Sequence, residues 1–177
     1  MKKELKISII SSYKRYTRKK FNILNYYDLY FRNYGFRCIV LLRKKQFLSK
    51  WRFISSFLLK MKLRKIKYKT GLWITPKTKI GNGFCIVHAM DIIINENTII
   101  GENFTVRQMT TIGNKGEKNP SECPIIGDNV ELGSNVCIIG GVKVGDNVSV
   151  GAGSVVVKDL PKNSICVGNP CQKKKDK

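Results

Sequence analysis

The chain contains one histidine, His88, and its imidazole is the side chain best suited to exchange a proton near neutral pH. A neutral imidazole whose pKa lies near the working pH is an efficient general base. His88 also lies at an irregularity: Ile86 and Ile94 are eight residues apart, whereas the neighbouring aliphatic residues recur every six. A lone histidine is ordinarily a surface residue at a corner, but this position favours a catalytic role.

A second interruption lies between Ile112 and Ile126, where no six-residue unit fits. We expect residues 113–125 to leave the repeat as a loop, because such excursions often form the binding face of a repeat protein. The loop carries Cys123 beside Glu122. Since a reactive thiolate needs positive surroundings, the neighbouring carboxylate disfavours a covalent acetyl-cysteine route.

The six cysteines have irregular spacings and include no Cys-x-x-Cys pair. With one histidine in the chain, this pattern predicts no metal site. Reduced thiols are typical of a cytosolic protein, and the basic N-terminus leads into no apolar core or cleavage site of a signal peptide. We therefore expect a cytoplasmic protein, with peripheral contact at the inner face of the cytoplasmic membrane as an open option.

A period of six residues organises the chain around these two interruptions. Branched aliphatic residues occupy every sixth position in three runs: Ile74, Ile80, Ile86; Ile94, Ile100, Val106, Ile112; and Ile126, Leu132, Ile138, Val144, Val150, Val156. Such a period is neither helical nor that of a simple half-buried strand. It predicts a coil of short parallel strands whose units bury their apolar faces by stacking, in preference to an antiparallel sandwich.

Charge divides the chain at Thr70-Gly71. Residues 1–70 hold 21 Lys/Arg against two acidic residues, a net charge of +19. Residues 71–177 hold 12 Lys/Arg against ten acidic residues, a net charge of +2. We expect residues 1–70 to form a basic amphipathic helical segment, residues 71–172 to form the repeat domain and residues 173–177 to form a basic tail.

The helical segment is predicted from apolar residues at three- to four-residue spacing, with Lys and Arg between them: Leu42, Phe47, Trp51, Ile54, Leu58 and Met61. Its longest apolar run, residues 38–42, is far below the ~18 residues that span a bilayer. Three interpretations remain open. The first is that the segment lies on an anionic membrane surface, the second that it packs on the end of the coil or on other subunits, and the third that it binds nucleic acid. Because the segment contains no recognisable nucleic-acid-binding motif, we expect no nucleic-acid partner.

Residues 71–172 resemble the hexapeptide-repeat acyltransferases, and within them the serine O-acetyltransferases. The most specific pieces are residues 151–161, the terminal Val167-Gly168-Asn169-Pro170, and residues 74–83, which match Ile-x-Pro-x-x-Lys-Ile-Gly-x-Gly. The resemblance implies a left-handed parallel β-helix, a homotrimer, acetyl-CoA as co-substrate and no metal. It also implies active sites between subunits, with His88 of one chain facing the loop of its neighbour.

The departures from this pattern bear on the acceptor. The serine enzymes have an Asp-His pair where this chain has Val87-His88, and Arg-His-Pro where it has Glu122-Cys123-Pro124; the Asp that supports their histidine aligns with Trp73. An exchange of Arg for Glu places an anion where a substrate carboxylate would bind. The pattern is closest to acetyltransferases of surface-polysaccharide (capsule or O-antigen) biosynthesis, which implies a sugar or lipid-linked saccharide acceptor. Trp73 offers an apolar face to a sugar ring, or else has a packing role.

The resemblance also implies a groove for acetyl-CoA, lined by small residues that let the pantetheine arm approach the backbone. The matching positions are Gly113, Gly133, Ser134, Ala152, Gly153 and Ser154. Lys158 and residues 173–175 either meet the CoA phosphates or are simply solvated, and Asn169-Pro170 would close the last coil near the adenine. Three alternatives stay open: serine acetylation, with Lys115 and Lys118 replacing the lost Arg, an amine acceptor, and an inactive β-helix scaffold.

Overall fold

The computed structural model describes residues 2–48, 53–116 and 122–177. Trp51 and Lys118 therefore lie outside the described residues. Four helices come first: α1 (Lys2–Thr17), α2 (Ile23–Arg32), α3 (Tyr34–Gln46) and α4 (Phe53–Thr70). The strands of the described residues follow: β1 (Lys79–Ile80), β2 (Cys85–Ile86), β3 (Ile93–Ile94), β4 (Ile99–Ile100), β5 (Thr105–Val106), β6 (Thr111–Gly113), β7 (Ile125–Ile126), β8 (Glu131–Leu132), β9 (Cys137–Ile139), β10 (Lys143–Val144), β11 (Ser149–Val150), β12 (Val155–Val156), β13 (Ser164–Val167) and β14 (Gln172–Asp176).

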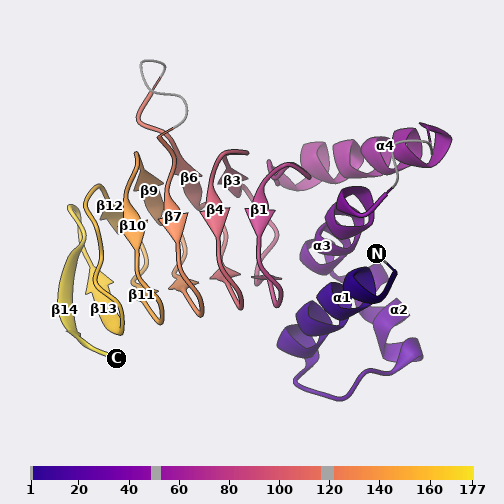
Figure 1. Ribbon diagram of the computed structural model, residues 1–177, viewed down its shortest axis with the longest axis horizontal. Helices are drawn as coiled ribbons and strands as arrows, with labels where there is room; N and C mark the ends of the chain where they lie inside the picture. The colour runs from indigo at the N-terminus through magenta and orange to yellow at the C-terminus, as the bar shows by residue number, and fades with distance from the viewer. Residues whose placement is uncertain (1, 49–52, 117–121) are drawn as a thin grey trace.

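The strands form the predicted parallel β-helix, with three sheets around one axis (Figure 1). The orders are β1-β4-β7-β10, β14-β13-β11-β8-β5-β2 and β12-β9-β6-β3, and each coil contributes one strand to each sheet in turn. Within a sheet the six-residue positions lie in register, as Ile94 with Ile112 and Ile112 with Ile138 do. The prediction of a repeat rather than a sandwich is thus confirmed.

Asparagine makes one row of corners. Asn103, Asn129 and Asn147 all have φ between +55° and +58°, a conformation that this side chain tolerates. Their amides also link neighbouring coils, since Asn103 Nδ2 donates to Asn129 Oδ1 at 3.0 Å. In the Gly-Asp-Asn turns at 127–129 and 145–147, asparagine is thus the residue with positive φ.

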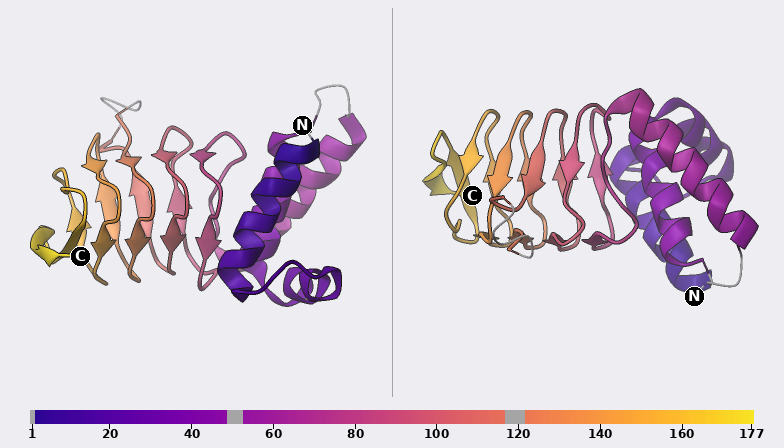
Figure 2. Two further views of the ribbon diagram at one scale, coloured as in Figure 1. Left: turned by 60° about the horizontal axis from the view of Figure 1, so that its bottom comes forward. Right: turned by 90° about the horizontal axis from the view of Figure 1, so that it is seen from above.

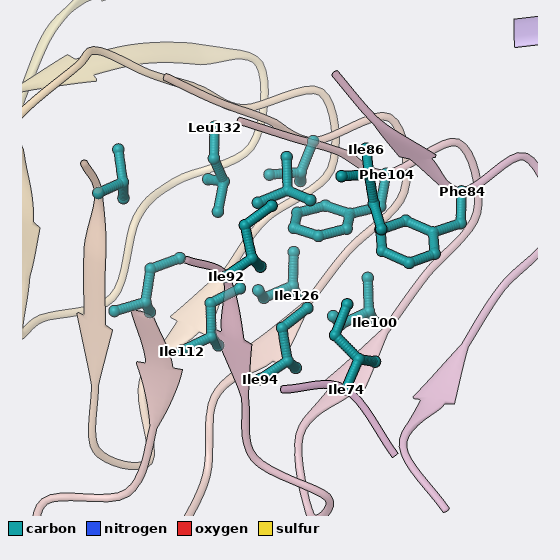
Figure 3. Close-up of a cluster of buried hydrophobic side chains, with 14 of the residues drawn as sticks. Ile74, Phe84, Ile86, Ile92, Ile94, Ile100, Phe104, Ile112, Ile126 and Leu132 are labelled. Carbon is teal, nitrogen blue, oxygen red and sulfur yellow. The ribbon is translucent and has the colours of Figure 1, made fainter. Parts of the chain in front are cut away.

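The core fills the space between the three sheets. All but one of the predicted six-residue positions are buried, and Figure 3 shows those that it labels, such as Ile94, Ile112 and Ile126, pointing into this space. The exception is Ile80, which is only partly buried in the first coil. Phe84 and Phe104 stack with ring centroids 5.8 Å apart, so aromatic rings fill the core of the first two coils.

The helical segment packs against the first coil, at the end of the β-helix opposite the C-terminal strands (Figures 1 and 2). This is the second of the three interpretations of residues 1–70. The proposed apolar stripe does not form one face: Leu42 is buried in α3, whereas Ile54, Leu58 and Met61 are exposed on α4. The reason is that α3 ends at Gln46 and a separate helix begins at Phe53.

Side chains of the helices satisfy backbone groups of the first coil, which has no coil before it. The hydroxyl of Tyr16 accepts a hydrogen bond from the Ile86 amide and donates one to the Ile86 carbonyl. The guanidinium of Arg43 donates to the carbonyls of Ile80 and Gly81, and Ser11 Oγ accepts from the Gly83 amide. Because Arg43 is buried, desolvation lowers the pKa of its guanidinium.

The last coil ends in an antiparallel pair. Within the segment expected as a basic tail, residues 173–176 belong to β14, which pairs with β13 and is exposed along its length. Lys173 forms an ion pair with Asp176 at 2.6 Å. The lysines of this end are therefore held on a strand beside the last coil.

Candidate active site

Two rows of corners flank the sheet β12-β9-β6-β3. We call the corners that enter this sheet the histidine edge: residues 87–92, 107–110, 133–136 and 151–154. We call the corners that leave it the loop edge, which among the described residues comprises 95–98, 114–116, 122–124, 140–142 and 157–159. The predicted site residues are divided between these two rows.

Backbone hydrogen bonds join the corners of the histidine edge. The Met109 amide donates to Met90 O at 3.0 Å, the Asn135 amide to Gln108 O at 2.9 Å and the Gly153 amide to Ser134 O at 2.9 Å. The row continues at the turn after β13, where the Val155 amide donates to Gly168 O. One edge thereby brings together these predicted residues: Val87, His88, Gly133, Ser134, Ala152, Gly153, Ser154, Asn169 and Pro170.

His88 lies at the first corner of this edge, next to the helical segment. Its side chain is exposed, and its carbonyl accepts a hydrogen bond from the Met90 amide at 2.9 Å. No residue in the described part of the chain donates to the imidazole ring or accepts from it within hydrogen-bonding distance. The ring is therefore accessible to a substrate, and its orientation is not fixed by a partner among the described residues of the same chain. Val87 is half-buried, and its amide donates to Val106 O.

The small residues of the histidine edge are required for different structural reasons. A Cβ at Gly133 would lie 2.5 Å from the backbone nitrogen of Ala152, so close stacking of coils requires glycine there. A Cβ at Gly153 would meet no atom within 4 Å, which leaves the backbone open to a ligand. Ser154 is buried, and its Oγ donates to Gly151 O and accepts from the Gly168 amide. The open backbone at Gly153 fits the approach of an extended pantetheine arm.

The loop edge holds the other predicted residues at the far ends of the same strands. Glu122 is exposed beside Gly141, and Cys123 is buried at the start of the chain segment that leads into β7. Burial raises the pKa of the Cys123 thiol. Lys158 is exposed, and Gly113 ends β6. The structure does not bring Glu122 and Cys123 to His88 within one chain, because the sheet lies between the two edges.

Trp73 lies on the same sheet, next to the histidine edge. It forms a β-bridge with Ile93, and its half-exposed ring carries the Lys67 ammonium 3.2 Å from the centroid, a close cation–π contact. A groove of about 620 Å³ extends from Trp73 along the end of α4 to Ala89, Met90 and Asp91. We call this the Trp73 groove. It places the indole beside the residues that follow His88.

The sequence analysis did not select Lys67, Met90 or Asp91. Lys67 is one of many cations in residues 1–70, and only the docking of α4 brings it to Trp73. Asp91 donates its amide to Thr70 O at 2.8 Å, which joins this corner to the end of α4. Asp91 also has a positive φ of +49°. In the sequence, the interruption of the six-residue period between Ile86 and Ile94 was the only feature that pointed to this corner.

The described residues contain no group of three or more His, Cys, Asp or Glu side chains that could hold a metal ion. None of the helices in the described part is long and apolar enough to cross a membrane.

The repeat is similar in sequence to known bacterial transferases. Residues 123–158 match the family described as bacterial transferase hexapeptide (six repeats). Over 104 residues, 59% of this chain, the sequence is 45% identical to WcaB of Escherichia coli K12, named for acetyltransferase function in colanic acid biosynthesis. Over the same length it is 38% identical to serine acetyltransferase of Staphylococcus aureus Mu50. The matches span 64% and 49% of those two proteins.

Solved structures of serine acetyltransferases have the same fold over nearly the whole chain. The soybean apoenzyme superimposes with a TM-score of 0.80 at 28% identity, covering 96% of this chain and 69% of that one. The enzyme of Neisseria gonorrhoeae gives a TM-score of 0.77 at 26% identity, covering 99% of this chain and 66% of that one. The similarity therefore includes the helical segment as well as the β-helix.

Proposed function

We propose that this chain is an acetyl-CoA-dependent O-acetyltransferase of the hexapeptide-repeat type to which its sequence is similar. The observation that carries the proposal is the hydrogen-bonded row of corners that aligns the exposed His88 with the open backbone at Gly153. A long thioester lying along this row would end beside a general base. The names of the related proteins support acetyl transfer as the reaction.

We propose a sugar hydroxyl in surface-polysaccharide biosynthesis as the acceptor. Val87 and Glu122 stand where serine enzymes hold the amino acid, and the Trp73 groove beside His88 offers an aromatic face of the kind that binds a sugar ring. The 45% identity to a protein named for colanic acid biosynthesis supports the same class. Serine is the second candidate, because the soybean enzyme complexed with serine superimposes with a TM-score of 0.81.

In the proposed mechanism, His88 accepts the proton of the acceptor hydroxyl as that oxygen attacks the acetyl thioester. General bases of this kind contribute about 10²- to 10⁴-fold. The proton is then available to the departing thiolate, so no covalent enzyme intermediate is required. Cys123 is a poor nucleophile in this scheme, since burial raises its pKa and keeps it a thiol.

We propose a homotrimer in which the histidine edge of one chain meets the loop edge of the next. The outward side chains Ile93, Ile99 and Ile125 leave apolar surface exposed on the two sheets that adjoin the loop edge. Cyclic packing of three would bury such faces symmetrically. It would also place residues of the adjacent subunit near the His88 imidazole, which has no hydrogen-bonding partner among the described residues of its own chain.

We propose that residues 1–70 also contact an anionic membrane surface. Among the ten residues of α2 none is buried, and its exposed Ile23, Tyr27 and Phe31 follow one another at four-residue intervals on one face. The net charge of +19 would add electrostatic attraction to anionic lipid. Co-sedimentation with phosphatidylglycerol vesicles, lost at high salt and absent with phosphatidylcholine, would support this contact; binding indifferent to lipid charge would contradict it.

The test of the main proposal is calorimetric titration of the purified protein with acetyl-CoA, followed by assay of free CoA release with sugar acceptors and with serine. Saturable binding and release that depends on a saccharide support sugar O-acetylation. Release that depends on serine would replace the acceptor and keep the reaction. A folded protein that binds no acetyl-CoA would contradict the proposal and identify an inactive scaffold.

A further inference from the structure

A second cavity lies between α2, α3 and α4, next to the Trp73 groove. Its volume is about 470 Å³, and its lining includes four cations, Arg37, Lys62, Lys65 and Lys69, together with Tyr30 and Tyr34. Its lining among the described residues includes no acidic side chain. We call this the basic cavity.

The four cations converge without a counter-charge from the described chain. Lys62, Lys65 and Lys69 are spaced i, i+3 and i+7, so they share one face of α4, and Arg37 faces them from α3 across the cavity. The ion pairs found among the described residues, such as Asp28–Arg32, include none of them. Like charges at such spacing destabilise a helix, and a bound anion would remove that cost.

Two of the four cations, Arg37 and Lys69, are held by aromatic residues. Arg37 donates to the carbonyls of Tyr30 and Phe31, and its guanidinium lies 4.8 Å from the centroid of the Tyr34 ring. The Lys69 ammonium also lies over the Tyr34 ring, 5.0 Å from its centroid. Its hydrogen bond to the Tyr34 hydroxyl also lowers the pKa of that tyrosine. A site whose donors are already fixed pays less entropy when an anion binds.

The basic cavity and the Trp73 groove are neighbours that share two lining residues. Tyr34 and Lys69 line both, and the groove reaches Ala89, the residue after His88. The seven residue steps of helix from Lys62 to Lys69 rise about 10 Å, which is wide for one phosphate and suits two linked phosphates. Volumes of this size are typical of small-molecule sites.

We propose that the basic cavity binds the diphosphate of a diphosphate-linked saccharide, whose sugar then lies in the Trp73 groove beside His88. This inference rests on the proposed function, because it names the class of acceptor for the same site. The diphosphate would be held by charge-assisted hydrogen bonds from the lysines and Arg37. The acceptor would be recognised through a group remote from the hydroxyl that reacts.

The test is calorimetric titration of the full chain with inorganic pyrophosphate, at saturating CoA so that sites for CoA phosphates are filled. The variant Lys65→Ala/Lys69→Ala removes two cations of the cavity, and Lys19→Ala/Lys20→Ala removes two exposed cations from the turn between α1 and α2. We expect affinity to fall about tenfold or more in the first variant and to stay within about twofold in the second. Equal affinity in the three proteins, or no saturable binding to the wild type, would overturn the inference.

Competition then identifies the source of the diphosphate. A uridine diphosphate sugar that displaces pyrophosphate indicates a soluble acceptor, and phosphatidylcholine vesicles carrying polyprenyl diphosphate that do so indicate a lipid-linked one. Displacement by neither, or equally by phosphatidylglycerol vesicles without diphosphate, would contradict a diphosphate site. Acetyl-CoA titration of the same variants separates the two proposals: intact acetyl-CoA binding without pyrophosphate binding refutes only this inference.

Discussion

The phenol of Tyr16 makes two hydrogen bonds to one residue, accepting from the Ile86 amide at 2.9 Å and donating to the Ile86 carbonyl at 2.8 Å. Ile86 belongs to β2, the edge strand of its sheet, and it precedes His88 by two residues. A helix side chain thus takes the place of the coil that would otherwise pair with this strand.

Replacement of Tyr16 by Phe should lower the free energy of unfolding by about 1–3 kcal/mol, because two backbone groups of Ile86 lose their partner in a buried place. Urea denaturation measures this change. Tyr68→Phe is the matched control, since Tyr68 is exposed and should tolerate the same substitution. An unchanged midpoint in Tyr16→Phe would mean that water replaces the hydroxyl without cost.

Stability should fall as the pH rises above about 10. Burial, followed by the nearby Cys85, raises the pKa of Tyr16 well above its ordinary value of 10.0, and burial raises that of Tyr26 to about 12. The unfolded chain then releases these protons first, so stability is fully present below pH 10 and is lost as the pH rises toward the folded pKa. Unfolding free energies between pH 9 and 11 measure the slope. Tyr16→Phe should make it shallower, and an unchanged slope would contradict the assignment.

His88→Ala should reduce CoA release by about 10²- to 10⁴-fold if the imidazole is the general base. Acetyl-CoA affinity should change little, because the ring reacts with the acceptor. Cys123→Ala is the contrasting variant and should keep its turnover, since the buried thiol has a raised pKa. The reverse pattern, with activity lost only in the cysteine variant, would support an acetyl-cysteine route instead.

Gly153→Asn should weaken acetyl-CoA binding about tenfold or more while leaving the fold intact. Gly153 has φ of +69°, and Asn135 has φ of +56° at the same corner one coil earlier, so asparagine suits this backbone. Its side chain would enter the space that the glycine leaves open. Calorimetry measures the affinity, and thermal unfolding checks the fold. Unchanged affinity would exclude this corner from the cofactor groove.

Trp73→Leu should raise the KM for the acceptor with little change in kcat, because a flat apolar face contributes to binding and not to proton transfer. The loss should be about 1–3 kcal/mol, the order seen when stacking surfaces are removed. Steady-state kinetics at saturating acetyl-CoA separates the two constants. A fall in kcat of that size with an unchanged KM would contradict a binding role and show instead that Trp73 positions His88.

The six-residue period predicted the β-helix because each Ile, Val or Leu of the repeat faces the same environment, as Ile112 does between Ile94 and Ile138. The two interruptions likewise predicted corners that depart from the coil. The way in which the helices pack on the first coil could not be predicted from the repeat. Tyr16 and Arg43 contact residues 70 and 37 positions away, and no period relates a helix side chain to an edge strand.

The same limit applies to the site. The row that joins His88 to Gly153 follows from the stacking of coils, which the six-residue period predicts. The division between the histidine edge and the loop edge needed the actual order of the sheets. Lys67 and Lys69 became site candidates only when the end of α4 was found beside Trp73 and Tyr34.

The contacts of Tyr16 and Arg43 also determine how long the stack can be. A parallel β-helix offers at each end a row of backbone groups that could pair with another coil, from the same chain or from a different molecule. Here side chains of α1 and α3 bond to the first row, and at the other end β14 adds to β13 in the antiparallel sense and becomes the edge strand of its sheet. Neither end therefore presents a parallel coil edge of the kind that a further coil would extend, which disfavours end-to-end growth into fibres.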